Sequence, residues 1–178
     1  MLPYTFTFSN NKYNIKTDSM KMISLCVIFV INIQLAGAQL KTTVVCPPFT
    51  VDLLEGTVSS KLDCNSTAGE VKKLFPCFTD TAIKNCGAVL YKDRDICFFT
   101  ARNYIEIGEK FNGKLVPNLL GASRGSLFSV LGSPKIKDVS WDAYQTKFGI
   151  MVVYYNKAGK INKLQISTKS TETLQLCE

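Results

Sequence analysis

The segment from Gly121 to Thr168 constrains the fold most, because it has the pattern of one helix followed by three strands. Apolar residues recur at helical spacing from Leu127 to Leu131, and Gly132 and Pro134 then end the helix. Three runs with strand-like composition follow: Trp141–Thr146, Gly149–Tyr155 and Ile161–Thr168. We therefore expect an α+β fold in which short helices pack on an antiparallel sheet.

A similar unit precedes this segment in the chain. Thr67 and Glu70 fit a capping box, and Pro76 ends the short apolar stripe that follows it. Strand-like runs are expected at 88–91, 96–100 and 104–107. The segments 64–107 and 121–168 thus indicate two similar halves, each a helix followed by a meander.

The other parts of the chain carry weaker patterns. Phe49, Val51 and Leu53 alternate with polar residues, as an edge strand would. Residues 56–63 and 108–120 are predicted to be polar connections without strands.

Residues 1–38 have the pattern of a leader that ends in a secretory signal. Lys16 and Lys21 precede an apolar stretch at about 22–35, and Ala36-Gly37-Ala38 is an A-x-A cleavage site. A membrane anchor is the alternative, but the stretch is short and interrupted by polar residues, so we expect no stable membrane span. The true start, Met1, Met20 or Met22, stays open. We expect a secreted, extracellular protein whose mature part, 39–178, is one domain.

Cysteine usage agrees with export. Cys26 lies in the signal, and the mature chain keeps Cys46, Cys64, Cys77, Cys86, Cys97 and Cys177. An even number of cysteines in an exported chain predicts three disulfides, with the pairing left open by the sequence. Metal binding is disfavoured, because these cysteines lack the close paired spacing of zinc ligands.

Asn65-Ser66-Thr67 is an N-glycosylation sequon. In the secretory pathway a glycan is expected on Asn65, which would place that side chain on the surface.

Several classes of chemistry are disfavoured by composition. The chain contains no histidine, which removes His-based nucleophilic, acid–base and zinc sites. It has no glycine-rich phosphate or dinucleotide motif, and we expect no cofactor. The net charge is +7, but the lysines are scattered rather than clustered, so nucleic-acid binding is not expected. We predict that the protein is not an enzyme.

The later strands carry the best candidate for binding. The expected apolar face consists of Trp141, Tyr144, Met151, Val153 and Tyr155. Core packing is the other interpretation of these side chains, since a small α+β domain needs them inside. Both faces of 149–155 are apolar, so one must be covered by the helices and N-terminal arm, by a partner protein or by an apolar ligand.

Two functions follow from this pattern. The first is a protein-binding or inhibitor-like module that contacts another extracellular protein through its sheet face and the loops near Asp93 and Asn156. The second is an extracellular carrier of a small hydrophobic ligand. Its lipocalin- or cystatin-like cup would be lined by Met151, Val153, Tyr155, Leu164 and Ile166.

The segments 121–134, Trp141 and 149–161 together resemble the SmpA/BamE-like pattern. That pattern has a G-x-[ST] start, an L-G-x-P helix stop, an aromatic strand and a hairpin that ends in G-K-[IV]. Secreted β-lactamase-inhibitory proteins contain the same helix-plus-meander unit twice. The resemblance implies a sheet face and loops for protein binding or envelope assembly, without catalysis, and it assigns no binding residue. The six cysteines and the sequon depart from those families.

Overall fold

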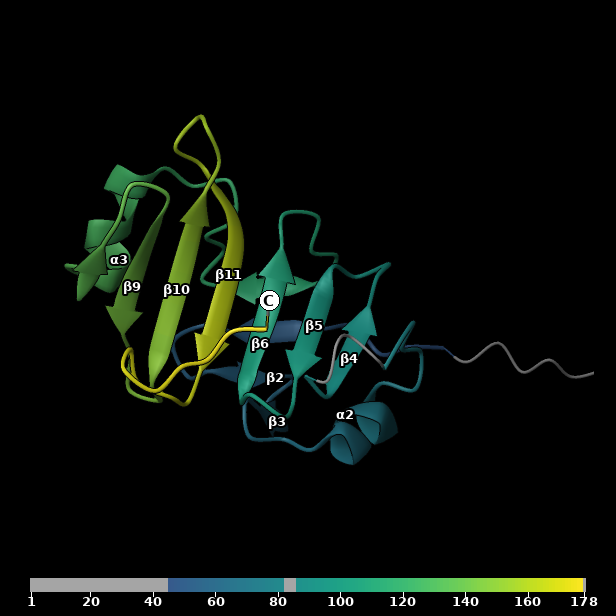
Figure 1. Cartoon of the computed structure of the whole chain (residues 1–178). Coiled ribbons are helices and arrows are strands. Elements are labelled where there is room, and N and C mark those ends of the chain that lie inside the picture. Colours follow the sequence, from purple (N-terminus) through teal and green to yellow (C-terminus); the bar gives the residue numbers. More distant parts are fainter. Residues whose placement is uncertain (1–44, 82–85, 178) are drawn as a thin grey trace, which may run out of the picture. The chain divides into compact units, whose positions relative to one another are not determined.

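The computed structural model describes residues 45–81 and 86–177 (Figure 1). The predicted leader and signal peptide, residues 1–38, lie outside this part. Among the described residues, no helix combines the length and the apolar character needed to cross a bilayer.

A seven-stranded antiparallel sheet forms the main layer. Its strands, in spatial order, are β4 (Ala88–Tyr91), β5 (Ile96–Phe99), β6 (Tyr104–Gly108), β11 (Ile161–Ser167), β10 (Ile150–Tyr155), β9 (Trp141–Gln145) and β8 (Ile136–Lys137). Two three-stranded meanders, β4–β5–β6 and β9–β10–β11, join where β6 pairs with β11, and β8 pairs with β9 at the edge. The strands predicted from the sequence are confirmed, and their ends differ by only a residue or so.

A second, four-stranded sheet was not expected. Its order is β3 (Leu62–Asp63), β2 (Thr57–Val58), β1 (Thr50–Asp52) and β7 (Lys114–Val116). The predicted edge strand near Val51 is an interior strand, because β2 pairs with β1 on one side and β7 pairs with it in parallel on the other. The segments predicted to be polar connections therefore contain β2, β3 and β7.

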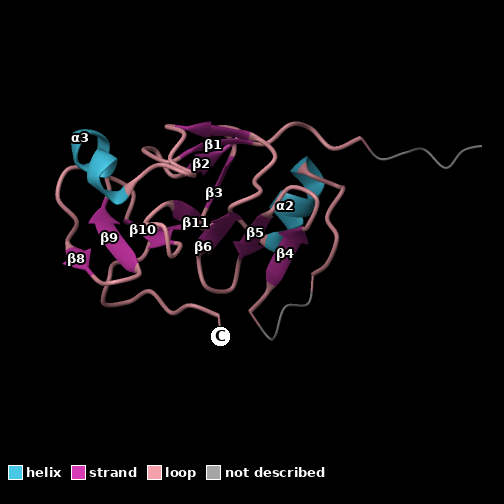
Figure 2. Cartoon of the chain, turned by 90° about the horizontal axis from the view of Figure 1, so that it is seen from above, coloured by secondary structure: helices cyan, strands magenta, loops and turns pink. Residues whose placement is uncertain are grey.

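Two short helical segments lie on the same side of the large sheet as the small sheet (Figure 2). The helix α2 (Ala68–Leu74) begins at the predicted capping box: the Glu70 amide donates to Thr67 Oγ1, 3.3 Å away, and the Thr67 amide donates to Glu70 Oε2, 2.8 Å away. The second segment is a 3₁₀ turn, η1 (Arg124–Leu127), that continues into the single turn α3 (Phe128–Leu131). Gly132 ends it, as predicted.

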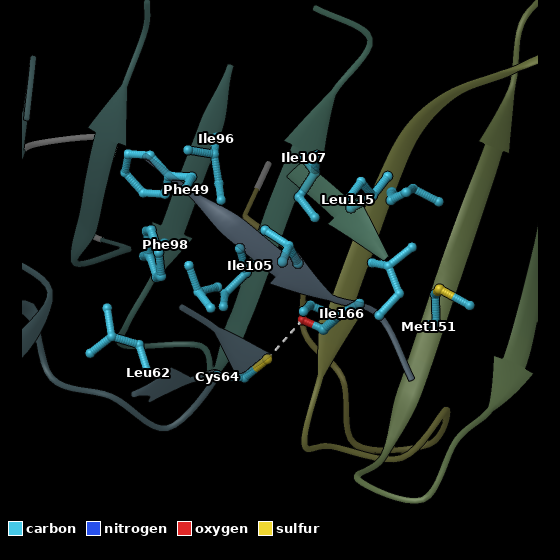
Figure 3. Packing of buried hydrophobic residues seen from close by; sticks show 14 of the residues in the cluster. Phe49, Leu62, Cys64, Ile96, Phe98, Ile105, Ile107, Leu115, Met151 and Ile166 are labelled. Atoms are coloured by element: carbon cyan, nitrogen blue, oxygen red, sulfur yellow. Dashed lines mark hydrogen bonds between the residues drawn. The ribbon is translucent and has the colours of Figure 1, made fainter. Parts of the chain in front are cut away.

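The main core fills the space between the two sheets and the helices (Figure 3). Phe49, next to β1, stacks on Phe75 with ring centroids 3.9 Å apart. The Tyr91 hydroxyl of β4 donates to the Phe75 carbonyl at 2.7 Å, so this phenol both packs in the core and satisfies the end of α2. The outcome is the predicted α+β class, with the small sheet as an additional layer.

The C-terminal segment crosses the opposite face of the large sheet (Figures 1 and 2). Leu174 packs against apolar side chains of β9 and β10, namely Ala143, Ile150 and Val152. The disulfide between Cys86 and Cys177 links the end of this segment to the residues just before β4.

Two disulfides are present among the described residues, which corrects the prediction of three. They are Cys46–Cys77 and Cys86–Cys177, while Cys64 and Cys97 are free thiols. The reason is topological. Cys64 lies in the core between the sheets, where its Sγ donates to the Ile166 carbonyl at 3.2 Å (Figure 3), whereas Cys97 packs on the opposite face of the large sheet. The large sheet separates the two thiols.

Candidate functional site

The structure divides the predicted apolar face between the two sides of the large sheet. Tyr144, Met151 and Val153 are buried in the core, and Tyr155 packs against that core from the same side. Trp141 instead packs on the opposite side, in a cluster with residues of β10. The five side chains therefore do not form one surface.

The region proposed from sequence as a ligand cup is filled by side chains. Met151, Val153, Leu164 and Ile166 are fully buried. They belong to one cluster with Val51 and other residues of the small sheet. The small sheet thus covers the face that the sequence left without a partner.

Asn65 lies in the turn between β3 and α2 and is exposed. Its Oδ1 accepts hydrogen bonds from Asn103 Nδ2 at 3.1 Å and from Thr168 Oγ1 at 2.7 Å. The surface position agrees with the expectation for a sequon, and the glycan itself stays a prediction.

The two loops proposed as contacts lie at the same end of the large sheet. Asp93 is in the β4–β5 turn, and Asn156 closes the β10–β11 hairpin, where its Oδ1 accepts from the amides of Ala158 and Lys160, each 3.0 Å away. They are not neighbours, because β5, β6 and β11 lie between β4 and β10.

A buried carboxylate organises the surface beside the Asn156 hairpin. Asp142 of β9 is 1% exposed, and Arg124 of η1 binds both of its oxygens: Nε donates to Oδ2 at 2.8 Å and Nη2 donates to Oδ1. The Tyr155 hydroxyl of β10 also donates to Oδ2, at 2.7 Å. Such a bidentate pair fixes geometry as well as charge.

The ring of Tyr155 also belongs to this cluster. The Arg124 guanidinium lies over the Tyr155 ring, 4.9 Å from its centroid. Burial, together with the hydrogen bond to Asp142, raises the pKa of Tyr155, so its hydroxyl stays a donor at physiological pH. Each charge in the cluster has a partner, so we interpret the cluster as a structural contact that holds η1 against β9 and β10.

Arg124 also holds the loop after β8. Its guanidinium donates to the Asp138 carbonyl at 2.5 Å and to the Val139 carbonyl at 3.4 Å. The loop is closed further by the Asp138 amide, which donates to the Trp141 carbonyl at 2.9 Å. The loop therefore has a defined conformation although its side chains face solvent.

Two hollows flank Arg124, and we call the area that they form the Arg124 surface. One hollow has a volume of about 320 Å³ and includes Phe128, Pro134 and Lys137 in its walls. The other has a volume of about 330 Å³ and includes Val139, Tyr155, Asn156 and Lys157. Phe128 is 69% exposed and Val139 is 92% exposed. Each hollow thus has an exposed apolar side chain in its wall, Phe128 in the first and Val139 in the second.

Sequence reasoning named only the Asn156 loop of this surface and missed the rest. Phe128 and Val130 fit the apolar stripe of a helix, but α3 is a single turn, and it leaves both side chains exposed. Asp142 carried a usable signal, because it falls on the inward face of an otherwise apolar strand, where a carboxylate requires a partner. The identity of that partner, Arg124, depends on how η1 packs against β9.

Within residues 45–81 and 86–177, no three His, Cys, Asp or Glu side chains are grouped so that they could hold a metal ion.

The resemblance of residues 121–168 to the SmpA/BamE-like unit, which β-lactamase-inhibitory proteins contain twice, rests on the order of a helix, its stop and three strands. The structure has this order in η1, α3, β9, β10 and β11. Order alone does not assign a family, so the resemblance stays a prediction. Comparison of the chain with protein-family models, with curated proteins and with solved structures found no match.

Proposed function

We propose that this protein is a secreted, non-enzymatic binding module of the inhibitor-like kind, and that its Arg124 surface contacts an acidic extracellular protein. The proposal is supported chiefly by one observation: two exposed apolar side chains, Phe128 and Val139, stand beside hollows on a surface held by hydrogen bonds.

The rigidity of the loop at Val139 is the first supporting argument. Exposed apolar side chains on a flexible loop lose entropy when they are ordered by a partner. Arg124 binds the carbonyls of residues 138 and 139, so Val139 is already held in place. Interfaces draw most of their affinity from a few side chains that fit into pockets, and aromatic residues and arginine are common among them.

The charge around the surface is the second argument. Lys137, Lys157 and Lys160 are exposed near the two hollows, and none of the three forms a salt bridge with another residue of 45–81 or 86–177. Without residues 1–38, which carry Lys12, Lys16, Lys21 and Asp18, the chain keeps 18 Lys and Arg against 13 Asp and Glu, a net charge of +5. A partner with acidic side chains would complement this charge and associate faster at low salt.

The two disulfides support the extracellular location in this proposal. Disulfides persist in oxidising environments such as the extracellular space and are rare in the cytosol. Together with the signal-peptide pattern, they favour secretion.

The proposal can be tested by site-specific photo-crosslinking. The full chain is expressed in a eukaryotic secretory host with a photoreactive phenylalanine analogue in place of Val139. A matched control carries the analogue at Leu54, which is also exposed but belongs to the β1–β2 turn. We expect a crosslinked protein from extracellular fluid at position 139 and none at position 54.

The captured protein is then used for affinity measurements. Val139→Ser is expected to weaken binding by about tenfold, and added salt should weaken it further. Leu54→Ser should bind like the unchanged chain. Equal crosslinking at both positions, or equal affinity of the two serine variants, would contradict the proposal.

A further inference from the structure

We propose that the outer face of the large sheet holds a binding site for a small, uncharged, apolar molecule with one or two rings. The site lies between β9 and β10 on one side and the C-terminal segment on the other. It is on the opposite side of the sheet from the core and does not depend on the Arg124 surface.

The walls of this pocket come from four elements: β8, which contributes Ile136, β9, β10 and the C-terminal segment. Ala143 of β9 and Ile150 and Val152 of β10 form the floor on the sheet, and Trp141 of β9 also lines the pocket. Leu174 and Leu176 of the C-terminal segment border the opposite side. The volume is about 260 Å³.

Tyr154 extends the wall on the side of Trp141, because the two residues are paired across β9 and β10. A flat aromatic pair beside an aliphatic floor is suited to a ring-shaped ligand, which can stack on the indole or the phenol.

The polar groups near the pocket already have partners within the protein. The Tyr154 hydroxyl donates to Gln165 Oε1 at 2.8 Å, and the Thr171 hydroxyl donates to Glu172 Oε1 at 2.6 Å.

The two lysines nearby are paired as well. Lys135 pairs with Glu172 at 3.1 Å, and Lys163 pairs with Glu106 at 3.4 Å. A charged ligand would have to displace one of these contacts or enter an apolar pocket unpaired, which is costly. The complementary occupant is therefore uncharged.

The volume limits the size of the occupant. An apolar cavity of about 150 Å³ holds benzene, and drug-sized ligands occupy pockets of about 300 Å³ or more. A pocket of about 260 Å³ lies between these values. It has room for a single substituted ring or two fused rings.

The C-terminal segment that covers the pocket is fastened at its end. Cys177 is bonded to Cys86, and its amide donates to the Tyr104 hydroxyl at 3.0 Å. Arg102 Nη1 donates to Gln175 Oε1 at 2.6 Å. Because these contacts hold the segment before any ligand arrives, binding costs little ordering of the chain.

Trp141 is the only tryptophan of the chain, so its fluorescence reports on this pocket. The full chain, secreted from a eukaryotic host, is titrated with tetralin as a two-ring probe and toluene as a one-ring probe. We expect a saturable change in tryptophan emission with each probe, because both probes are small enough for the pocket.

Two variants test the location of the site. Ala143→Phe places a ring on the pocket floor and should weaken tetralin binding by about tenfold or more. Cys86→Ser/Cys177→Ser releases the C-terminal segment and should weaken it to a similar degree. Cys46→Ser/Cys77→Ser removes the other disulfide, far from the pocket, and should bind tetralin like the unchanged chain.

A change in emission that never saturates would overturn the proposal. So would equal tetralin affinity in the unchanged chain and in folded Ala143→Phe. If Ala143→Phe does not fold, the comparison of the two disulfide variants decides: equal affinity in both overturns the proposal.

Discussion

At the scale of single residues, Cys64 and Cys97 are thiols that the fold keeps apart. Burial, with a smaller contribution from Asp63, raises the pKa of the Cys64 thiol to about 12. Burial, with a smaller contribution from Glu106, raises the pKa of the Cys97 thiol to about 12. Since the thiolate is the reactive form, both side chains should be inert in the folded protein.

This predicts the outcome of alkylation without a reductant. Iodoacetamide at neutral pH should leave the folded protein unlabelled. For the mature chain, residues 39–178, which lacks Cys26, the same reagent in denaturant should add a mass of two labels, on Cys64 and Cys97. Intact-mass spectrometry followed by peptide mapping makes the measurement. Absence of labelling in denaturant would show that a third disulfide exists, and labelling of the folded protein would show that the thiols are accessible.

At the scale of elements, the Arg124–Asp142 pair joins η1 to the sheet. The single turn α3 is too short to be stable alone, and it buries little apolar surface, so its position depends on this joint. Arg124 of this pair also holds the loop at Val139. The stability of η1 and α3 and the geometry of the proposed binding surface therefore depend on the same residue.

Removal of the arginine should therefore be costly. Arg124→Ala leaves the Asp142 carboxylate buried without its cation, and we expect a loss of about 3 kcal/mol in the free energy of unfolding. Denaturant unfolding measures this value. Adding Asp142→Asn to Arg124→Ala should recover part of the loss, because the unpaired charge is removed.

Lys135→Ala is the matched control, since it breaks an ion pair with Glu172 that is largely exposed. Its stability should change little. A loss in Arg124→Ala no larger than that in Lys135→Ala would contradict the role given to the buried pair.

Local sequence patterns predicted some elements well and others not at all. The capping box at Thr67 and the two meanders were predictable, because caps, alternation and turns act over a few residues. Strands β2 and β3 have two residues each, which is too short for a periodic pattern. The similarity of segments 64–107 and 121–168 stays a prediction, although each contains a short helix before a meander.

At the scale of the whole molecule, tyrosine side chains are buried at several places in the fold. Burial is the main reason that the pKa of Tyr104 is raised to about 12, and burial also raises the pKa of Tyr91 and Tyr155. In the unfolded chain these groups titrate near 10.0. The folded state therefore holds their protons at a pH at which the unfolded state loses them.

Stability should consequently fall in alkaline solution. Below about pH 10 the tyrosines are protonated in both states and their contribution is fully present. Between about pH 10 and 12 the unfolded chain binds fewer protons than the folded one, so the free energy of unfolding decreases as pH rises. Denaturant unfolding at a series of pH values tests this.

The measurement is best made in Cys64→Ala/Cys97→Ala, which has no free thiol among the described cysteines to attack the disulfides. Absorbance of tyrosinate, recorded in parallel, should lag in the folded protein relative to the denatured one. A free energy of unfolding that stays constant between about pH 8 and 11 would contradict the prediction.

The sequence by itself determined the features that depend on neighbours along the chain: the α+β class, the cap of α2 and the strands of both meanders. Only the tertiary structure decided which faces are covered. The small sheet exists because β1 pairs with β7 across a long stretch of chain, and it fills the face that the sequence left open. The separation of Cys64 from Cys97 and the meeting of Arg124 with Asp142 also depend on such distant contacts, which no local pattern encodes.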